Sequence, residues 1–396
     1  MIMSSLKKRR HRILISGLLF LALLFSGCGE DPRQGLPGGA APAVIELWHT
    51  LKGTEAEALL QEVQKIMDRH PEVIIYPEYV AEEKIVSRTY YAQAGGEGPE
   101  IILASAQVLN ELLLQGALAP VLGESDSFVG LENQFKYGEK LYAHCLATDV
   151  PLFYYRTDLA EPPGKLEDLF ASKGVLAVTS LTTQTFAPWW LAQGGKLASN
   201  GQPTLNNAAN FLFLQQLLAW QESKLLLVDP NAWNLFLESQ AAYTIAGAGQ
   251  AQSLSKDLPW GSMPLNQLTA GQGGIMTSRT IGIANSSIKS TEDLKPLLTL
   301  VMNELLSPDA QWAIAQGGKR FPASSSFYSR EEAQTGVLRQ VGLSLAQAWS
   351  LPENSQEKKY ITIQDQAWQN VWNGVDPVEA LAQAQEAAQK SLEKGE

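Results

Sequence analysis

The chain has 396 residues, of which 45% are hydrophobic and 18% are charged, and its formal net charge is −11. This length exceeds what one hydrophobic core usually serves, so two domains are expected, and the apolar content argues against disorder. An acidic chain does not suit nucleic-acid binding, which needs a basic surface. The two cysteines, Cys28 and Cys145, are too few for a disulfide framework.

The N-terminus has the pattern of a secretory signal peptide. Residues 1–27 contain five basic residues and no acid, and the apolar run 13–25 is too short for a comfortable membrane span. The run ends in Leu-Phe-Ser-Gly-Cys at 24–28, which resembles the bacterial lipobox, with Phe25 in place of the usual leucine. We therefore predict a lipoprotein signal peptide and a lipidated Cys28. The alternative is a plain secretory signal followed by an unrelated cysteine.

The segment after the signal peptide is predicted to be a flexible tether. Residues 28–43 consist mainly of Gly, Pro and Ala and show no periodicity. Removal of residues 1–27 would change the net charge from −11 to about −16, because five positive charges are lost. A lipid anchor, a tether and an acidic body predict a protein that works outside the cell membrane and touches it only through the lipid.

From residue 44 onward, predicted strands and helices alternate, which is typical of βαβ units with a parallel sheet. The helix predicted at 55–69 has its apolar residues at helical spacing. The run 99–104 is continuously apolar, as in a buried parallel strand. The other elements of this part are strands at 44–48 and 73–79 and helices at 82–93 and 106–115.

Residues 140–159 are predicted to carry the chain from one domain to the other. Two short strands, 141–146 and 150–155, are separated by a polar step that ends in Asp149. Proline cannot donate a hydrogen bond to a sheet, so Pro151 indicates a strand start or an edge strand. Asp149 would then lie where a cleft between two domains opens.

The remaining chain continues the alternation and then becomes helical. A polar loop at 182–185 precedes a short helix, and 274–284 is predicted to return the chain to the first domain, because 280–284 resembles the return segment of the protein family described in the next paragraphs. The other predicted elements are strands at 175–180 and 241–245, helices at 186–192, 206–221, 231–238, 293–306 and 308–315, and mainly helix from about residue 326.

Five stretches, in the same order along the chain, resemble motifs of the family 1 extracellular solute-binding proteins. They read GEGPEIILASAQVLNELLLQGALAPV at 96–121, YGEKLYAHCLATDVPLFYYRTDL at 137–159, AAYTIAGAG at 241–249, LLSPDAQWAIAQGGKRFPAS at 305–324 and VWNGVDPVEALAQAQEAA at 371–388. Members of this family are the substrate-capturing subunits of ABC importers, and the maltose/maltodextrin-binding protein is the best known.

The resemblance implies a periplasmic-binding-protein-like fold, with two α/β lobes, a cleft between them and crossover strands that join them. The N-terminal lobe is expected to contain residues 44–148 and 282–325, and the C-terminal lobe residues 149–281 and 326–396. The resemblance also implies a monomer without enzymatic activity, cofactor or metal, whose partners are the permease subunits of an ABC importer.

In the first half of the chain, the resemblance implies four ligand-binding candidates near the cleft. Lys52 follows the first strand, in a loop that contacts the ligand in sugar-binding relatives, and Trp48 either stacks on a sugar or packs internally. Gln107 stands where several relatives place an aromatic residue and a carboxylate, and it can bond a hydroxyl. Asp149 matches an acidic ligand residue of the family, or else is a structural aspartate of the hinge.

In the second half, the candidates are Gln184 in the polar loop, one of Trp189 and Trp190, and Trp260. We therefore expect a lipid-anchored protein that captures a sugar or oligosaccharide in the cleft and delivers it to an ABC importer. Alternatives within the same fold are a polyamine, a ferric chelate or a peptide as ligand, or a sensor that reports to a membrane receptor. No HExxH or GxSxG motif supports an extracytoplasmic hydrolase.

Overall fold

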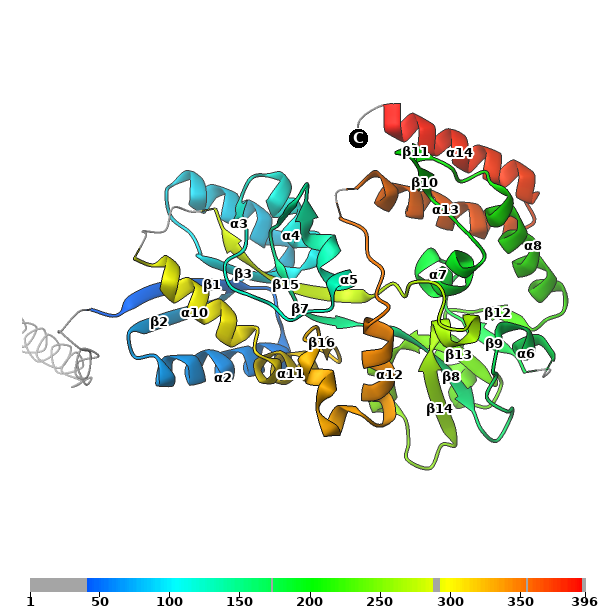
Figure 1. Ribbon diagram of the computed structural model, residues 1–396, viewed down its shortest axis with the longest axis horizontal. Helices are drawn as coiled ribbons and strands as arrows, with labels where there is room; N and C mark the ends of the chain where they lie inside the picture. Colours follow the sequence, from blue (N-terminus) through cyan, green and yellow to red (C-terminus); the bar gives the residue numbers. More distant parts are fainter. Residues whose placement is uncertain (1–40, 172–173, 288–292, 354, 394–396) are drawn as a thin grey trace, which may run out of the picture.

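The chain forms two α/β lobes, each built around its own β-sheet (Figure 1). The structure, a computed structural model, describes residues 41–171, 174–287, 293–353 and 355–393. The predicted signal peptide, the lipidation site Cys28 and residues 28–40 of the tether therefore lie outside the described residues. None of the described helices is both long and apolar enough to cross a membrane.

The first lobe contains a seven-stranded mixed sheet. In spatial order its strands are β16 (Phe321–Pro322), β7 (His144–Asp149), β15 (Ser278–Ser286), β3 (Ile101–Ser105), β1 (Ala43–His49) and β2 (Val73–Tyr79), and β4 (Leu118–Ala119) pairs with β15. β1 is parallel to β2 and β3, whereas β15 is antiparallel to β3 and β7. The predicted parallel sheet is therefore mixed, because the strand that returns from the second lobe enters in the opposite direction.

Helices cover both faces of this sheet, which explains the continuously apolar β3. Ile101 and Leu103 pack in the core with α2, α10 and α11, while Ile102 and Ala104 pack with α3 and α4. The helices of the lobe are α2 (Gly53–Arg69), α3 (Glu82–Ala94), α4 (Ala106–Leu114), α5 (Val129–Glu132), α10 (Lys295–Leu305) and α11 (Pro308–Gly317).

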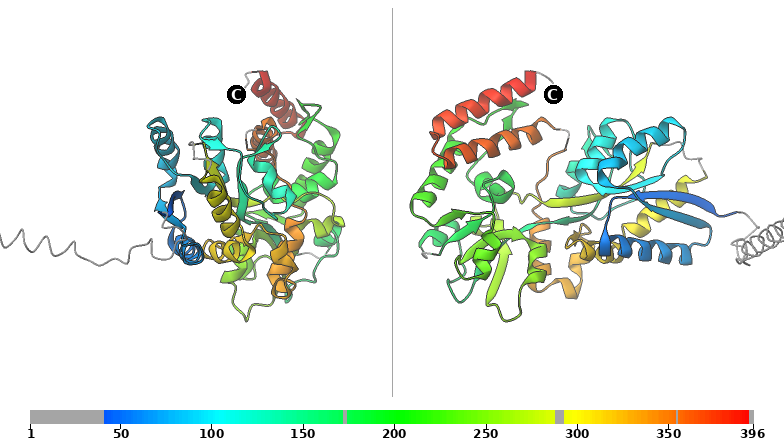
Figure 2. Two further views of the ribbon diagram at one scale, coloured as in Figure 1. Left: turned by 60° about the vertical axis from the view of Figure 1, so that its left-hand side comes forward. Right: turned by 180° about the vertical axis from the view of Figure 1, so that it is seen from behind.

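The second lobe is built on a five-stranded sheet. In spatial order its strands are β12 (Leu226–Val228), β9 (Leu176–Val178), β13 (Tyr243–Gly247), β8 (Pro151–Arg156) and β14 (Trp260–Pro264). Its helices are α6 (Leu166–Ala171), α7 (Thr183–Ala192), α8 (Ala208–Glu222), α9 (Ala232–Leu237), α12 (Gly336–Leu345), α13 (Gln356–Trp372) and α14 (Pro377–Glu393). α13 and α14 pack side by side on the outside of this lobe (Figure 2).

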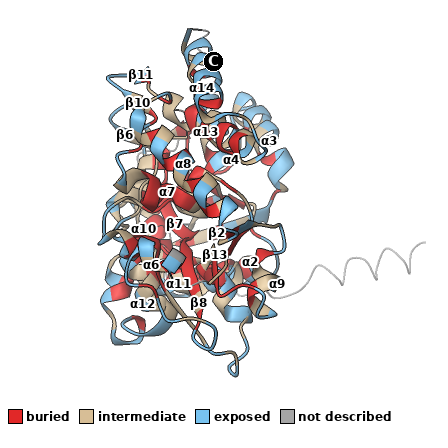
Figure 3. Cartoon of the chain, turned by 90° about the vertical axis from the view of Figure 1, so that its right-hand side faces the viewer, coloured by how far each residue is buried: buried red, intermediate tan, exposed pale blue. Residues whose placement is uncertain are grey.

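Burial follows this layering. α14 buries one stripe of small and apolar residues, which includes Ala380, Leu381 and Ala384, and exposes the opposite face (Figure 3).

The smaller elements are β5 (Lys136–Tyr137), β6 (Lys140–Leu141), β10 (Ala198–Ser199), β11 (Gln202–Pro203) and the 3₁₀ helices η2 (Asn133–Phe135), η3 (Ala248–Ser253), η4 (Leu265–Thr269), η5 (Ser326–Ser329) and η6 (Glu331–Ala333).

Crossover strands join the two lobes, as the sequence predicts. β7 pairs with β15 in the first sheet, β8 pairs with β13 in the second, and the chain passes between the sheets at Asp149 and Val150. Pro151 is the first residue of β8, which lies inside the second sheet between β13 and β14. Of the two positions that proline permits, the strand start is therefore the one that the chain uses.

Candidate ligand-binding site

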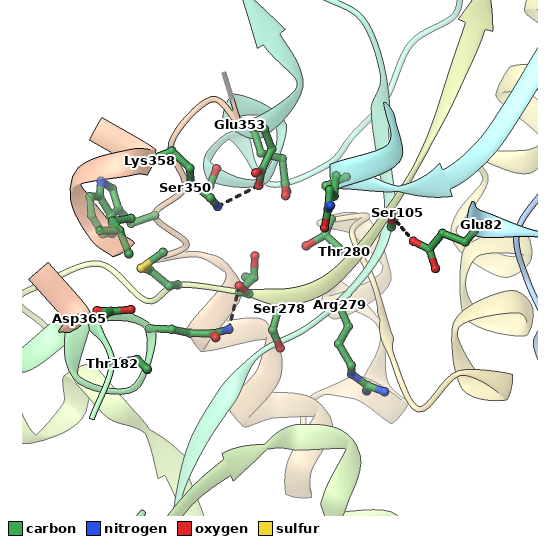
Figure 4. A pocket seen from close by; sticks show the side chains of 18 residues that line it. Glu82, Ser105, Thr182, Ser278, Arg279, Thr280, Ser350, Glu353, Lys358 and Asp365 are labelled. Atoms are coloured by element: carbon green, nitrogen blue, oxygen red, sulfur yellow. Dashed lines mark hydrogen bonds and ion pairs between the residues drawn. The ribbon is translucent and has the colours of Figure 1, made fainter. Parts of the chain in front are cut away.

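A cavity of about 470 Å³ lies between the two lobes, beside the start of β15 (Figure 4). This volume is within the usual range of small-molecule sites. Its lining combines hydroxyl, amide, carboxylate and aromatic groups. The lining residues are Glu82, Ser105, Ala106, Gln107, Gln134, Thr182, Gln184, Met276, Thr277, Ser278, Arg279, Thr280, Trp349, Ser350, Glu353, Lys358, Ile361 and Asp365.

The wall from the first lobe is formed where β2 and β3 lead into helices. Ser105 ends β3 and caps α4, because its Oγ accepts a hydrogen bond from the backbone N of Val108. The same Oγ donates to Glu82 Oε1 over 2.6 Å. Glu82 is in the first turn of α3, where the helix dipole favours a negative charge. Gln107 follows in the first turn of α4 and is exposed.

The wall from the second lobe is formed by the N-terminus of α7 and by α13. Thr182 caps α7, and its neighbour Thr183 donates to Asp365 Oδ1 from both its backbone N and its Oγ1, each over 2.6 Å. Burial raises the pKa of the Asp365 carboxyl, although these two hydrogen bonds act in the opposite direction. Gln184 donates from its Nε2 to the backbone oxygen of Thr277 over 3.1 Å.

The segment between α12 and α13 completes the lining and contacts the first lobe. The backbone N of Glu353 donates to the backbone oxygen of Gln134 over 3.2 Å, and Ser350 Oγ donates to the backbone oxygen of Gly130. Lys358 Nζ lies 2.8 Å from Glu353 Oε1. Trp349 is the only tryptophan among the described lining residues, it is partly exposed, and its ring centroid is 6.4 Å from that of Trp190.

Of the residues expected to bind ligand, Gln107 and Gln184 line this cavity. Trp189 and Trp190 do not. Both side chains are fully buried in the core of the second lobe, where Trp189 Nε1 donates to the Leu265 oxygen and Trp190 Nε1 to Asn210 Oδ1. The structure therefore gives no support to the expectation that one of them faces the ligand: both rings pack in the core and their polar atoms are paired.

Trp48, Lys52 and Trp260 also lie away from the cavity lining. Trp48 is buried under Arg88, whose guanidinium carbon is 4.2 Å from the ring centroid. Lys52 is the exposed N-cap residue of α2. Trp260 is in β14, with its ring 5.9 Å from that of Tyr154. Of the readings offered for Trp48, the structure supports internal packing.

Asp149 is 5% exposed and does not line the cavity. Its Oδ1 accepts from the backbone N of Val150 over 3.0 Å and of Gly249 over 3.2 Å, and its Oδ2 is 3.1 Å from Arg279 Nη2. Burial raises the pKa of this carboxyl, with Arg279 acting in the opposite direction. These contacts favour the hinge role for Asp149 over the ligand role.

The same network extends across the connection between the lobes. The Arg279 guanidinium also donates to the backbone oxygens of Gly318 over 3.2 Å and of Lys319 over 2.6 Å. A Cβ on Gly247 would lie 2.2 Å from Asp149 Oδ2, so only glycine fits beside the carboxylate. Asp149, Arg279 and Gly247 therefore form a compact hinge network behind the cavity.

Sequence reasoning missed most of the cavity lining. Glu82 and Ser105 follow strands whose carboxyl ends meet at one sheet edge, which is a signal that the sequence contains. Trp349 and Asp365 carry no comparable local signal, because only the folded C-terminal segment brings them to the cavity. Within the described residues, no group of three or more His, Cys, Asp or Glu is placed to hold a metal ion.

Two α/β lobes joined by crossover strands around a polar cavity define the periplasmic-binding-protein fold. The chain belongs to the family of bacterial extracellular solute-binding proteins, whose family model matches residues 63–340. The resemblance seen in the sequence is thereby confirmed, and the protein is a solute-binding protein of an extracellular family rather than an enzyme. No curated protein sequence matches the chain.

Several solved structures share the fold. The maltose/maltodextrin-binding domain MalE from Bdellovibrio bacteriovorus bound to maltotriose has a TM-score of 0.64 at 20% identity, and covers 89% of this chain and 100% of its own. A cyclo/maltodextrin-binding protein complexed with maltotetraose has a TM-score of 0.76 at 15% identity, over 90% and 99% of the chains. MalE from Xanthomonas citri has a TM-score of 0.75 at 16% identity, over 89% and 98%.

Proposed function

We propose that the protein captures a carbohydrate in the cavity between its lobes and delivers it to the permease of an ABC importer, while a lipid on Cys28 holds it at the outer side of the cell membrane. The observation that carries the proposal is the lining of the cavity. It places Trp349 among amides, hydroxyls and carboxylates, which together suit a ring with apolar C–H faces and polar edges. The saccharides bound by maltotriose- and maltotetraose-binding relatives of the same fold support this ligand class.

The proposed contacts follow from the chemistry of each group. The Trp349 ring stacks on a sugar face, and Gln107 and Gln184 bond ring hydroxyls from opposite lobes. Glu82 and Asp365 accept charge-assisted hydrogen bonds from ligand hydroxyls, and these bonds are stronger than neutral ones. A ligand held from both lobes stabilises the closed arrangement, so binding and closure are coupled.

The proposed lobes are residues 44–148 with 282–325 and residues 149–281 with 326–396. The separate sheets of β7 and β8 support the first division, at Asp149. The second division, before residue 282, falls inside β15, whose residues from Ser278 onward pair in the first sheet. The boundary between the two lobes at this second crossing is therefore better placed before β15, near Thr277.

The test is calorimetric titration of the mature protein with glucose and its α-1,4 and β-1,4 oligomers of two to four units. We expect at least one saccharide to bind, and Trp349→Ala to weaken its binding about 5- to 30-fold through loss of aromatic contact, which is worth ~1–2 kcal/mol. Trp260→Ala is the matched control, because Trp260 is also a partly exposed tryptophan but lies outside the cavity. Binding of spermidine with no saccharide binding would contradict the proposal.

A further inference from the structure

The cavity lining contains more carboxylates than cations that are free to bind a ligand. Within the part of the chain that the structure describes, five ionisable residues line the cavity: Glu82, Arg279, Glu353, Lys358 and Asp365. The two cationic side chains among them already have partners within the protein. Lys358 is paired with Glu353, and the Arg279 guanidinium is turned to Asp149 and to backbone oxygens of the hinge network.

Two carboxylates remain that are not paired with a cation among the described lining residues. Glu82 accepts a hydrogen bond from Ser105, and Asp365 accepts two from Thr183. Each is close to a helix N-terminus, and at Asp365 the two hydrogen bonds from Thr183 oppose the rise in pKa that burial causes. These contacts fix the positions of the carboxylates without cancelling their charge, so the cavity presents two negative groups to a ligand.

The two carboxylates lie on opposite sides of the cavity and come from different lobes (Figure 4). Glu82 belongs to α3 of the first lobe, whereas Asp365 belongs to α13 of the second. The proposed closure of the lobes would bring them nearer to one another, and like charges repel more strongly as they approach and lose contact with water. A positive charge on the ligand would offset the repulsion between the two carboxylates and so favour closure.

The aromatic residue of the lining fits the same conclusion. Trp349 contributes an indole to the lining, and the indole face is the side-chain surface that attracts ammonium groups most strongly. An indole face combined with carboxylates on two walls can recognise a ligand that has both apolar ring faces and a protonated amine. An anionic ligand would meet the two carboxylates with no unoccupied cation of the described lining to offset them.

We propose that the natural ligand is an amine-bearing saccharide, whose protonated amino group lies against Asp365 or Glu82 while its hydroxyls contact the amides of the cavity. This inference rests on the proposed function and narrows it to one chemical class. It also assigns Glu82 and Asp365 as the residues that determine specificity for charge.

The experiment compares matched β-1,4 oligomers of two to four units that differ only at C2: glucosamine, N-acetylglucosamine and glucose. Each is titrated calorimetrically into the mature protein at low salt, at a pH where the amine is protonated. We expect the glucosamine oligomers to bind at least about 10-fold more tightly than both neutral series, a difference of ~1.4 kcal/mol. The α-1,4 glucose oligomers are included as a further neutral series.

The variants Asp365→Asn and Glu82→Gln remove one charge each and keep the shape of the side chain. Either or both should weaken binding of the glucosamine oligomers about 10-fold more than binding of the neutral oligomers, because the neutral ligands lose only charge-assisted hydroxyl contacts whereas the amine also loses its counter-charge. Glu83→Gln is the control, because Glu83 is the adjacent exposed carboxylate of α3 and is outside the lining. Thermal unfolding of each variant separates a loss of folding from a loss of binding.

The outcomes distinguish this inference from the proposed function. Equal affinities across the matched series, or tighter binding of the neutral oligomers, overturn the inference and leave carbohydrate capture standing. A preference for glucosamine that survives both substitutions overturns the assignment of Glu82 and Asp365. If no saccharide of any series binds, the proposed function falls and the inference falls with it.

Discussion

At the residue scale, Asp149 shows how a single carboxylate can hold the connection between two lobes. It is buried, and it accepts hydrogen bonds from two backbone N–H groups and from Arg279. A ligand hydroxyl would have to displace one of these donors to reach it. Its position at the crossing was predictable from the polar step before Pro151, but its partners were not, because Gly249 and Arg279 are at least 100 residues away.

We expect Asp149→Ala to lower the free energy of unfolding by about 1–3 kcal/mol, because it leaves buried N–H donors without an acceptor. Since Asp149 does not line the cavity, the substitution should change the affinities of all saccharides by the same factor. Urea unfolding and calorimetry on one sample measure both quantities. A variant of normal stability that loses binding of some saccharides and not of others would show that Asp149 contacts the ligand.

The pH dependence of stability tests the same residue. Burial raises the pKa of Asp149 above its usual value of 3.8, so the folded protein binds this proton more tightly than the unfolded chain does. The stabilisation from protonation is complete below about pH 3.8 and is lost as the pH rises through the folded-state pKa. We therefore expect the stability of the natural protein relative to Asp149→Asn to fall across that window. A difference in unfolding free energy that is constant with pH would contradict this.

At the element scale, α7 shows why the sequence could not separate tryptophans of the core from residues that line the cavity. Phe186, Ala187, Pro188, Trp189 and Trp190 are all buried, so this helix is enclosed on several sides and has no polar face over these residues. A helix of this kind gives no periodic signal that separates a core face from a ligand face. The part of α7 that lines the cavity is instead its polar N-terminus, with Thr182 and Gln184.

The elements predicted well are those with a strong local pattern. The amphipathic α2, the strand β2 and the helix α3 agree with their predicted ranges within about three residues at each end. The strands β12 and β14, in contrast, were not predicted. β12 has only three residues, and the tertiary pairing of β14 with β8 decides that Trp260–Pro264 is a strand.

Substitution of Trp190 tests the core assignment of α7. We expect Trp190→Ala to lower the free energy of unfolding by about 3–5 kcal/mol, because a large cavity forms and Asn210 loses its hydrogen bond from the indole. The affinity of the protein that remains folded should be unchanged. Urea unfolding followed by calorimetry below the transition measures both. Lost affinity at near-normal stability would place Trp190 in the ligand site instead.

At the scale of the whole molecule, two lobes with separate sheets are connected by three stretches of chain that lie around the cavity. β7–β8, the segment before β15 and the α12–α13 connection all contribute to the hinge region or to the lining. The two-lobed fold could be predicted because five ordered stretches resemble motifs of a known family, and that resemblance implies the fold. The lining could not, since it joins residues from Glu82 to Asp365 that only the folded chain brings together.

Ligand binding should close the lobes, because residues that line the cavity come from both of them. We expect the radius of gyration measured by small-angle scattering to decrease when a saturating saccharide is added to the mature protein. Trp349→Ala at the same saccharide concentration should show a smaller change. Identical scattering profiles for the free and the saturated natural protein would contradict closure.

Attachment to the membrane should depend on one cysteine. We expect Cys28→Ser to abolish incorporation of a radioactive fatty acid in cells that express the full chain. Cys145→Ser is the control, because Cys145 is buried in β7 and should leave labelling intact. Label in the Cys28→Ser protein equal to that of the natural protein would exclude the proposed anchor.

The most direct test of the central claim is a crystal structure of the mature protein with the saccharide that binds most tightly in calorimetry. We predict electron density for the sugar between the lobes, with one ring face against Trp349 and hydroxyl or amino groups within hydrogen-bond distance of Glu82 or Asp365. Density for the sugar on an outer surface, with the cavity between the lobes filled only by water, would contradict the claim.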